Sequence, residues 1–91
     1  MKMPEALAEN PSYINVIIET PKGNGVKYTF DPKTKLFKLS KILAEGLTFP
    51  FHFGFIPQTK GEDGDPLDVL VLLNEPCYPG CHIECKAIRE L

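Results

Sequence analysis

Residues 62–73 read Glu62-Asp63-Gly64-Asp65-Pro66-Leu67-Asp68-Val69-Leu70-Val71-Leu72-Leu73. Four carboxylates fall within the first seven of these positions, and five apolar residues follow without a break. The apolar run is rich in leucine and valine and predicts a strand that is buried on both faces. Gly64 permits backbone angles that other residues avoid, and Pro66 fixes its own φ, so the acidic part is expected to form a shaped turn.

The acidic turn is a candidate cation site. In an extended chain Asp63 and Asp65 share a face and Asp68 points away, but a bend at residues 64–66 would bring all three to the start of the strand. Carboxylates this close repel one another unless a cation lies among them. Oxygen ligands without nearby sulfur favour Mg²⁺, Mn²⁺ or Ca²⁺ over zinc. A solvated acidic turn is the alternative, because turns that contain glycine and proline are often acidic.

The string Asp63-Gly64-Asp65-Pro66-Leu67-Asp68-Val69 resembles the signature of the soluble family I inorganic pyrophosphatases, an Asp-x-Asp-Pro-apolar-Asp-apolar motif. The resemblance extends in order from Ile14 to the C-terminus. It is carried by Val16-Ile17-Ile18-Glu19-Thr20-Pro21, Val26-Lys27-Tyr28, Phe49-Pro50-Phe51-His52-Phe53-Gly54-Phe55-Ile56 and Pro79-Gly80. This resemblance implies an OB-like barrel and the Mg²⁺-dependent hydrolysis of inorganic pyrophosphate to two phosphates, with Mn²⁺ as a second candidate cofactor.

The resemblance also implies roles for individual residues. Asp63, Asp65 and Asp68 match the metal ligands of the family, and Asp65 also matches the residue assigned to water activation. Lys27 matches a phosphate-binding lysine, and Glu19 matches a glutamate that lines the same cavity. An exposed cross-strand pair is the alternative for Glu19 and Lys27. The chemistry requires charge neutralisation on both phosphoryl groups and an activated water, which several divalent ions can supply.

Several positions depart from the family pattern. The phosphate-binding arginine of the family corresponds to Lys41 or to Ser40, depending on the direction in which the residues are counted. A lysine keeps the charge of arginine but loses its bidentate fork. Phe49 and Phe53 stand where the family has two active-site tyrosines, so the rings keep their packing but lack the hydroxyl.

The composition limits the class of protein. Ninety-one residues make one small domain, which buries only about 60–65% of the surface of its unfolded chain. With 10 basic and 12 acidic residues, the net charge of −2 provides no basic field for nucleic acid. No apolar run reaches membrane length, and the opening Met1-Lys2-Met3-Pro4 is not typical of a signal peptide, so we expect a cytoplasmic protein that contacts no membrane.

Short strands separated by glycine and proline turns predict an all-β barrel or sandwich. We expect an N-terminal arm at residues 1–12, with one helical turn, and a single domain at residues 13–91. The expected strands are 13–20, 26–31, 35–40, 49–56, 69–73 and 81–91, with a loop or a brief helix at 41–48. The turn Lys22-Gly23-Asn24-Gly25 predicts a hairpin between the first two strands.

Cys77, Cys81 and Cys85 are spaced by four, with His82 among them. A zinc site is one interpretation, although structural zinc sites usually contain the tighter Cys-x₂-Cys spacing. The alternation of small apolar and polar residues from position 81 favours reduced thiols that point inward from a strand.

The second acidic cluster of the family lies beyond the last residue of this sequence. The barrel is therefore expected to be incomplete, to expose a strand edge and to form a homo-oligomer, with a symmetric dimer as the simplest closed form. Two functions remain open. One is an active inorganic pyrophosphatase, and the other is a catalytically inactive, shortened homologue that binds metal or phosphate or serves as an assembly module.

Overall fold

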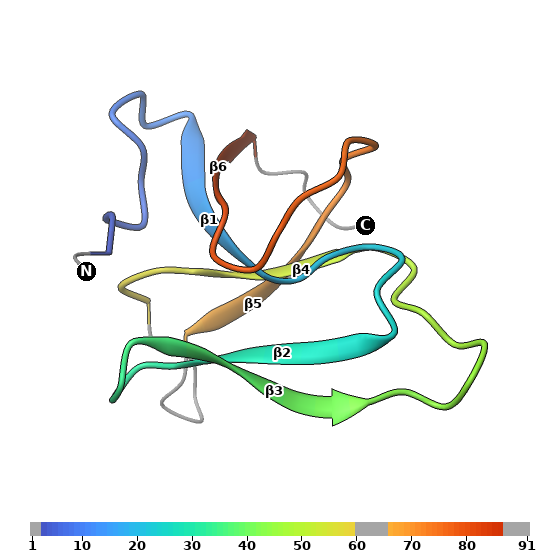
Figure 1. Ribbon diagram of the computed structural model, residues 1–91. Coiled ribbons are helices and arrows are strands. Elements are labelled where there is room, and N and C mark those ends of the chain that lie inside the picture. Colours follow the sequence, from blue (N-terminus) through green and yellow to red (C-terminus); the bar gives the residue numbers. More distant parts are fainter. Residues whose placement is uncertain (1–2, 60–65, 87–91) are drawn as a thin grey trace.

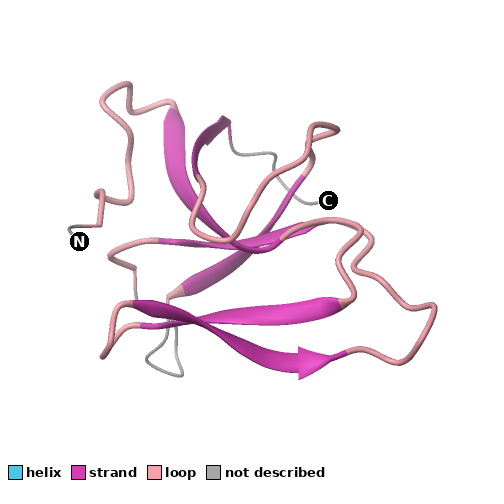
Figure 2. Ribbon diagram, viewed as in Figure 1, coloured by secondary structure: helices cyan, strands magenta, loops and turns pink. Residues whose placement is uncertain are grey.

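The computed structural model describes residues 3–59 and 66–86, and every regular element among them is a β-strand (Figure 1). Figure 2 shows the strands and the loops that join them. The all-β class is confirmed. In chain order the strands are β1 (Tyr13–Thr20), β2 (Val26–Asp31), β3 (Leu36–Ile42), β4 (His52–Ile56), β5 (Leu67–Val71) and β6 (His82–Lys86).

The strands form two antiparallel sheets. One has four strands in the order β5-β4-β1-β6, and the other is a two-stranded ribbon of β2 and β3. The expected hairpin between residues 13–20 and 26–31 is therefore wrong, because β2 pairs with β3 and not with β1. The glycine-containing turn instead forms two backbone hydrogen bonds with the distant Phe49. The N–H of Gly23 donates to the carbonyl of Phe49 at 2.8 Å, and the N–H of Phe49 donates to the carbonyl of Asn24 at 3.0 Å.

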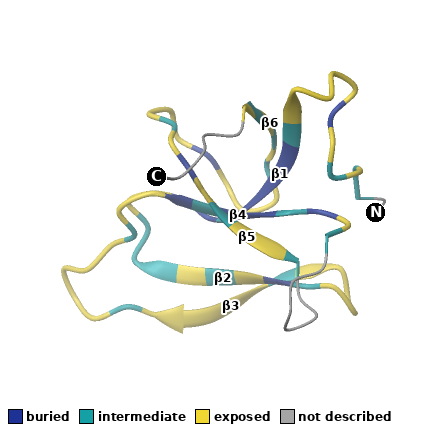
Figure 3. Cartoon of the chain, turned by 180° about the vertical axis from the view of Figure 1, so that it is seen from behind, coloured by how far each residue is buried: buried dark blue, intermediate teal, exposed yellow. Residues whose placement is uncertain are grey.

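The central strand β1 is the one that is buried on both faces. Val16 and Ile18 belong to one apolar cluster, with Val71 and Cys77, while Ile17 packs on the opposite side with Phe30 and Phe55. In Figure 3 β1 is dark blue beyond its exposed start, and its neighbour β4 is also partly dark blue, whereas β5 and β6 are mainly teal and yellow. This burial follows from topology, since β1 lies between β4 and β6 and also contacts β2.

The apolar strand after the acidic turn is less buried than its sequence predicts. It begins at Leu67, two residues earlier than expected, and it forms one edge of the sheet. Val71 is buried, but Leu70 is 55% exposed and Leu72, just beyond the strand, is 67% exposed. The prediction of burial on both faces is therefore wrong, because Val69, Val71 and Leu73 belong to or pack against one core cluster, whereas the alternate residues Leu70 and Leu72 are exposed.

Two further expectations differ from the structure in the loops. The N-terminal arm contains no helical turn among its described residues and is joined to β1 by an isolated bridge between Leu7 and Ile14. The segment after β3 is a loop with Gly46 at φ 87°, as expected, although β3 itself continues two residues further, to Ile42.

The three cysteines are free, as expected, and belong to the core. Cys77 is buried, and Cys81 and Cys85 pack against the same cluster. Burial raises the pKa of both Cys77 and Cys85, and the neighbouring thiol of Cys81 adds to the effect on the pKa of Cys77. Among the described residues, no group of three or more histidine, cysteine or acidic side chains is placed to hold a metal ion. The described strand β6 covers residues 82–86 of the expected 81–91.

The N-terminal arm is fixed to the sheet by Asn15. Its buried side chain donates to the carbonyl of Glu5 at 2.8 Å and to that of Leu7 at 3.3 Å. Its Oδ1 lies 2.7 Å from Nε2 of His82 on the neighbouring strand β6. In residues 3–59 and 66–86 there is no helix long and apolar enough to cross a membrane.

Candidate functional site

A cavity of about 310 Å³ lies where β1, β2, β4 and β5 meet. Three of its described lining residues are charged, namely Glu19, Lys27 and Asp68, and each comes from a different strand. All three are site residues that the sequence predicts. The structure therefore brings together in one cavity the described carboxylates and the lysine that are separated by up to 49 positions in the chain.

An irregularity in β1 directs Glu19 into this cavity. Ile18 pairs with Gly54 and Thr20 pairs with Phe53, so β1 advances two residues while β4 advances one. In a regular strand Glu19 and Thr20 would point to opposite faces. A bulge removes this alternation, and both side chains line the cavity.

Two polar contacts hold the end of β1 against β2. Thr20 is 1% exposed. Its hydroxyl accepts a hydrogen bond from the N–H of Tyr28 and donates one to the carbonyl of Tyr28, both at 3.0 Å. Glu19 Oε2 accepts the N–H of Phe30 at 2.8 Å. These bonds connect the two sheets at the cavity, and Thr20 is a positioning residue that sequence patterns do not reveal.

Lys27 lines the cavity from β2, and Lys41 is its register partner on β3. The next register pair is Tyr28 with Leu39, so Ser40 is the additional residue of a second strand irregularity. Lys41 and not Ser40 therefore lies opposite Lys27. Unlike Lys27, neither Ser40 nor Lys41 lines the cavity. In the described part of the chain neither lysine forms an ion pair.

Asp68 reaches the cavity from β5, where it is the register partner of Phe55 on β4. Its side chain is exposed, as a residue that meets solvent-borne ligands must be. Asp63 and Asp65, the other predicted metal ligands, lie outside the described residues. Their predicted convergence with Asp68 stays a prediction.

Aromatic rings form the apolar side of the cavity. Phe30 and Phe55 stack with centroids 5.2 Å apart and are both buried. Phe49 and Phe53 meet edge to face at 6.0 Å and are half-buried. Core packing therefore explains one pair, while the other pair leaves aromatic surface at the cavity.

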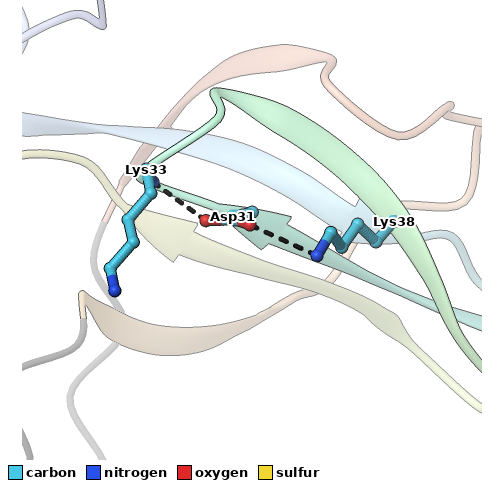
Figure 4. Close-up of polar contacts among 3 residues, drawn as sticks. All are labelled: Asp31, Lys33 and Lys38. Atoms are coloured by element: carbon cyan, nitrogen blue, oxygen red, sulfur yellow. Dashed lines mark hydrogen bonds and ion pairs between the residues drawn. The ribbon is translucent and has the colours of Figure 1, made fainter.

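The turn after β2 supports the cavity wall formed by Phe30 and Pro32. Asp31 Oδ1 accepts the N–H of Lys33 at 2.9 Å, and Asp31 Oδ2 lies 3.4 Å from Lys38 Nζ (Figure 4). The N–H of Lys33, and to a lesser extent the ammonium of Lys38, lower the pKa of Asp31 below its ordinary value of 3.8. The carboxylate form of Asp31 is thus the one that the turn stabilises.

His52 is a second residue whose importance the sequence does not show. It is 2% exposed, and its Nδ1 accepts the N–H of Lys22 at 2.9 Å. Its Nε2 lies 2.9 Å from the carbonyl of Glu75 and therefore carries the proton in this arrangement. The ring fastens two loops to β4, next to the cavity residue Phe53.

These features define an all-β protein with a cavity in which carboxylates and lysine face half-buried aromatic rings. The model of the inorganic pyrophosphatase family matches residues 16–91, so this chain belongs to the inorganic pyrophosphatase family.

Relatives and solved structures agree with this assignment. The chain is 51% identical over 80 residues to a soluble inorganic pyrophosphatase of Solanum tuberosum, covering 88% of this chain and 38% of the relative. It is 45% identical over 78 residues to the inorganic pyrophosphatase of Sulfolobus acidocaldarius, covering 86% of this chain and 45% of that protein.

The crystal structure of the Thermus thermophilus inorganic pyrophosphatase superposes with a TM-score of 0.80 at 41% identity, over 90% of this chain and 47% of the other. The crystal structure of an inorganic pyrophosphatase from Neisseria gonorrhoeae superposes with a TM-score of 0.85 at 34% identity, over 96% of this chain and 50% of the other. The fold is therefore the OB-like fold of these proteins. The chain spans between about two fifths and one half of the length of these proteins.

Proposed function

We propose that this chain binds inorganic diphosphate together with Mg²⁺ and hydrolyses it to two phosphates. The observation that carries the proposal is the convergence of Glu19, Lys27 and Asp68 from three strands on one cavity. The names of the related proteins support the substrate, since each of those proteins is an inorganic pyrophosphatase.

The charges of the cavity favour a divalent cation. Among its described lining residues, two carboxylates face one lysine, so a diphosphate anion would be repelled without further positive charge. Carboxylate oxygens are hard ligands that suit Mg²⁺ or Mn²⁺. Asp68 would hold the ion, with Asp63 and Asp65 completing the set and Asp65 accepting the proton of the attacking water. When bound, the ion supplies charge neutralisation and a more acidic water.

The opposed lysines of the β2–β3 ribbon favour an anion. Like charges directly across an antiparallel pair destabilise the sheet, because their side chains are only about 5 Å apart at Cβ. Lys27 and Lys41 are such a pair. A phosphoryl group near both lysines would relieve the repulsion. We therefore assign Lys27, which lines the cavity, to the reacting phosphoryl oxygens, and we propose Lys41, which lies opposite Lys27 without lining the cavity, as a second substrate-binding lysine.

A second candidate function is supported by Phe49 and Phe53. Both line the cavity and neither carries a group that can bond to a phosphoryl oxygen or to water. A chain with these residues could bind metal and phosphate, or serve as an assembly module, without hydrolysing diphosphate. We retain this catalytically inactive homologue as the alternative.

Phosphate release from inorganic diphosphate in millimolar Mg²⁺ distinguishes the two functions. The proposal expects release by the wild type, loss of release in Asp68→Asn, and no change in Glu84→Gln, a matched carboxylate on β6 that does not line the cavity. Mg²⁺ should also raise the melting temperature of the wild type and not that of Asp68→Asn. A Mg²⁺-dependent thermal shift without phosphate release would select the alternative.

We further propose that the protein is a cytoplasmic homo-oligomer, since relatives of this chain are named soluble enzymes. In the described part of the chain, the outer edges of β5 and β6 have no strand partner. Leu67 and Leu70 on β5 are 46% and 55% exposed. Pairing between copies would satisfy the backbone groups and cover these side chains. Light scattering at micromolar concentration tests this proposal, and a folded monomer would refute it.

A further inference from the structure

The cavity has two chemically different halves. Among its described lining residues, Glu19, Lys27 and Asp68 form a charged half, and Phe49 and Phe53 belong to an aromatic half. An inorganic diphosphate ion can use only the charged half, because phosphoryl oxygens gain nothing from a hydrocarbon ring and lose water beside it. The aromatic half therefore suits a different part of a ligand.

Phe49 and Phe53 leave aromatic surface at the cavity. Both are half-buried, whereas the neighbouring pair of Phe30 and Phe55 is buried and committed to the core. The rings of Phe49 and Phe53 meet edge to face at 6.0 Å and both line the cavity. An edge-to-face pair does not use every ring face, so a planar group in the cavity can stack on this pair.

Both rings are held by backbone bonds on ordered elements. Phe53 lies on β4, where it pairs with Thr20 on β1 and with Leu70 on β5. Phe49 is fixed by two backbone hydrogen bonds to the turn that begins β2, at Gly23 and Asn24. The same β2 carries Lys27 three positions beyond Asn24. The aromatic and the charged halves are thus fixed relative to one another before a ligand binds, which lowers the cost of binding.

The size of the cavity agrees with a ligand larger than inorganic diphosphate. A volume of about 310 Å³ lies at the lower end of the range of sites that enclose organic ligands, roughly 300–1,000 Å³.

We infer that this site binds nucleoside diphosphates, with the diphosphate in the charged half and the base stacked on Phe49 and Phe53. The inference rests on the proposed function for the position of the diphosphate and extends it to the organic group. Base stacking is the interaction that half-buried phenylalanine rings lining a cavity provide, and it tolerates any base.

The test compares two non-hydrolysable ligands that differ only by an adenosine group, methylenediphosphonate and α,β-methylene-ADP. Both are titrated calorimetrically into the full chain with Mg²⁺ present. The inference expects α,β-methylene-ADP to bind about five- to tenfold more tightly. It also expects upfield ring-current shifts of the adenine H2 and H8 resonances in the complex.

Phe49→Leu and Phe53→Leu keep an apolar side chain and remove the ring. Each should reduce the advantage of α,β-methylene-ADP to about twofold or less. Phe51→Leu is the matched control, because Phe51 belongs to the same segment but does not line the cavity; it should keep the full advantage. Far-UV circular dichroism checks that each variant is folded, and the adenine shifts of the wild type decide the matter if neither cavity variant folds.

The outcomes separate the two proposals. If methylenediphosphonate binds and adenosine adds nothing, the nucleotide inference is overturned and diphosphate binding stands. If the advantage is present but survives in both phenylalanine variants, the assignment to the aromatic half is overturned. If neither ligand binds in Mg²⁺, both the inference and the proposed diphosphate site are overturned.

Discussion

Gly54 lies where β4 approaches β1 most closely, and Gly54→Ala should destabilise the fold. A Cβ atom built on Gly54 would lie 2.6 Å from the carbonyl oxygen of Ile17 and 2.9 Å from Cγ1 of Val16. Contacts under 3.0 Å are essentially unknown for real Cβ atoms, and the first of these atoms belongs to the backbone. The two strands must therefore separate locally in the variant.

The expected cost follows from the overlap. Over-packing a core usually costs about 1–3 kcal/mol. The upper end applies at Gly54, because a backbone oxygen cannot rotate away as a side chain can. The alanine also lowers the conformational entropy of the unfolded chain, which stabilises the folded state by roughly 0.4–1 kcal/mol and offsets part of this cost. We therefore expect a net loss of about 2 kcal/mol, against a total stability of about 5–14 kcal/mol for a domain of this size.

Urea denaturation followed by far-UV circular dichroism measures this loss. Gly25→Ala is the matched control, because the nearest atom to its added Cβ is a backbone oxygen at an ordinary 3.6 Å. Gly25→Ala should leave the midpoint unchanged or raise it slightly, because it restricts the unfolded chain without a clash, whereas Gly54→Ala should lower the midpoint with a similar m-value. Equal midpoints for the two variants would refute the close approach of β1 and β4.

Three further changes have defined outcomes. Because the pKa of Asp31 is lowered, its carboxylate stabilises the fold above pH 3.8 and that contribution disappears as the pH falls through the lowered pKa; acid titration of stability should therefore be steeper in the wild type than in Asp31→Asn, and parallel curves would contradict this. His52→Leu leaves the N–H of Lys22 and the carbonyl of Glu75 without their hydrogen-bond partner, and the free energy of unfolding from urea denaturation should fall by about 2–4 kcal/mol. A loss below about 1 kcal/mol would show that water replaces the ring. Because burial raises the pKa of Cys77 and Cys85, the folded chain favours the neutral thiols, and this contribution to stability is lost as the pH rises above 9.0. Iodoacetamide at pH 8 should alkylate both thiols more slowly in the folded than in the denatured chain, and equal rates would refute their burial.

The strands themselves could be predicted from local patterns. Alternating residues, glycine turns and proline breaks predict every strand to within a few residues at its described ends, and β1 matches residues 13–20 at both ends. The three charged residues of the cavity also follow from the family motif, since Glu19, Lys27 and Asp68 lie together in the structure. Local sequence is sufficient for the strands, because each strand depends on residues close in the chain. The three charged residues are separated by up to 49 positions, and only the family resemblance predicts that they share a cavity.

Pairing and burial could not be predicted in the same way. The turn at residues 22–25 has the composition of a hairpin, but its backbone groups bond to Phe49 and β2 pairs with β3. The run at residues 69–73 has the composition of a central strand, but β5 forms an edge. In both cases the outcome depends on a segment far away in the chain, which a local pattern does not contain.

The position of the candidate site depends on an irregularity that a strict two-residue period excludes. Regular alternation would place Glu19 on the face opposite Thr20. The bulge at residues 18–20 puts both into the cavity, and it lies directly beside the pair of Ile18 and Gly54. Gly54 permits the close approach of β4 at that point, because a side chain there would meet the carbonyl of Ile17. A glycine with no side chain thereby permits the strand approach beside the bulge that directs a carboxylate into the cavity. Gly54→Ala should for this reason weaken Mg²⁺ binding even under conditions in which the variant is fully folded.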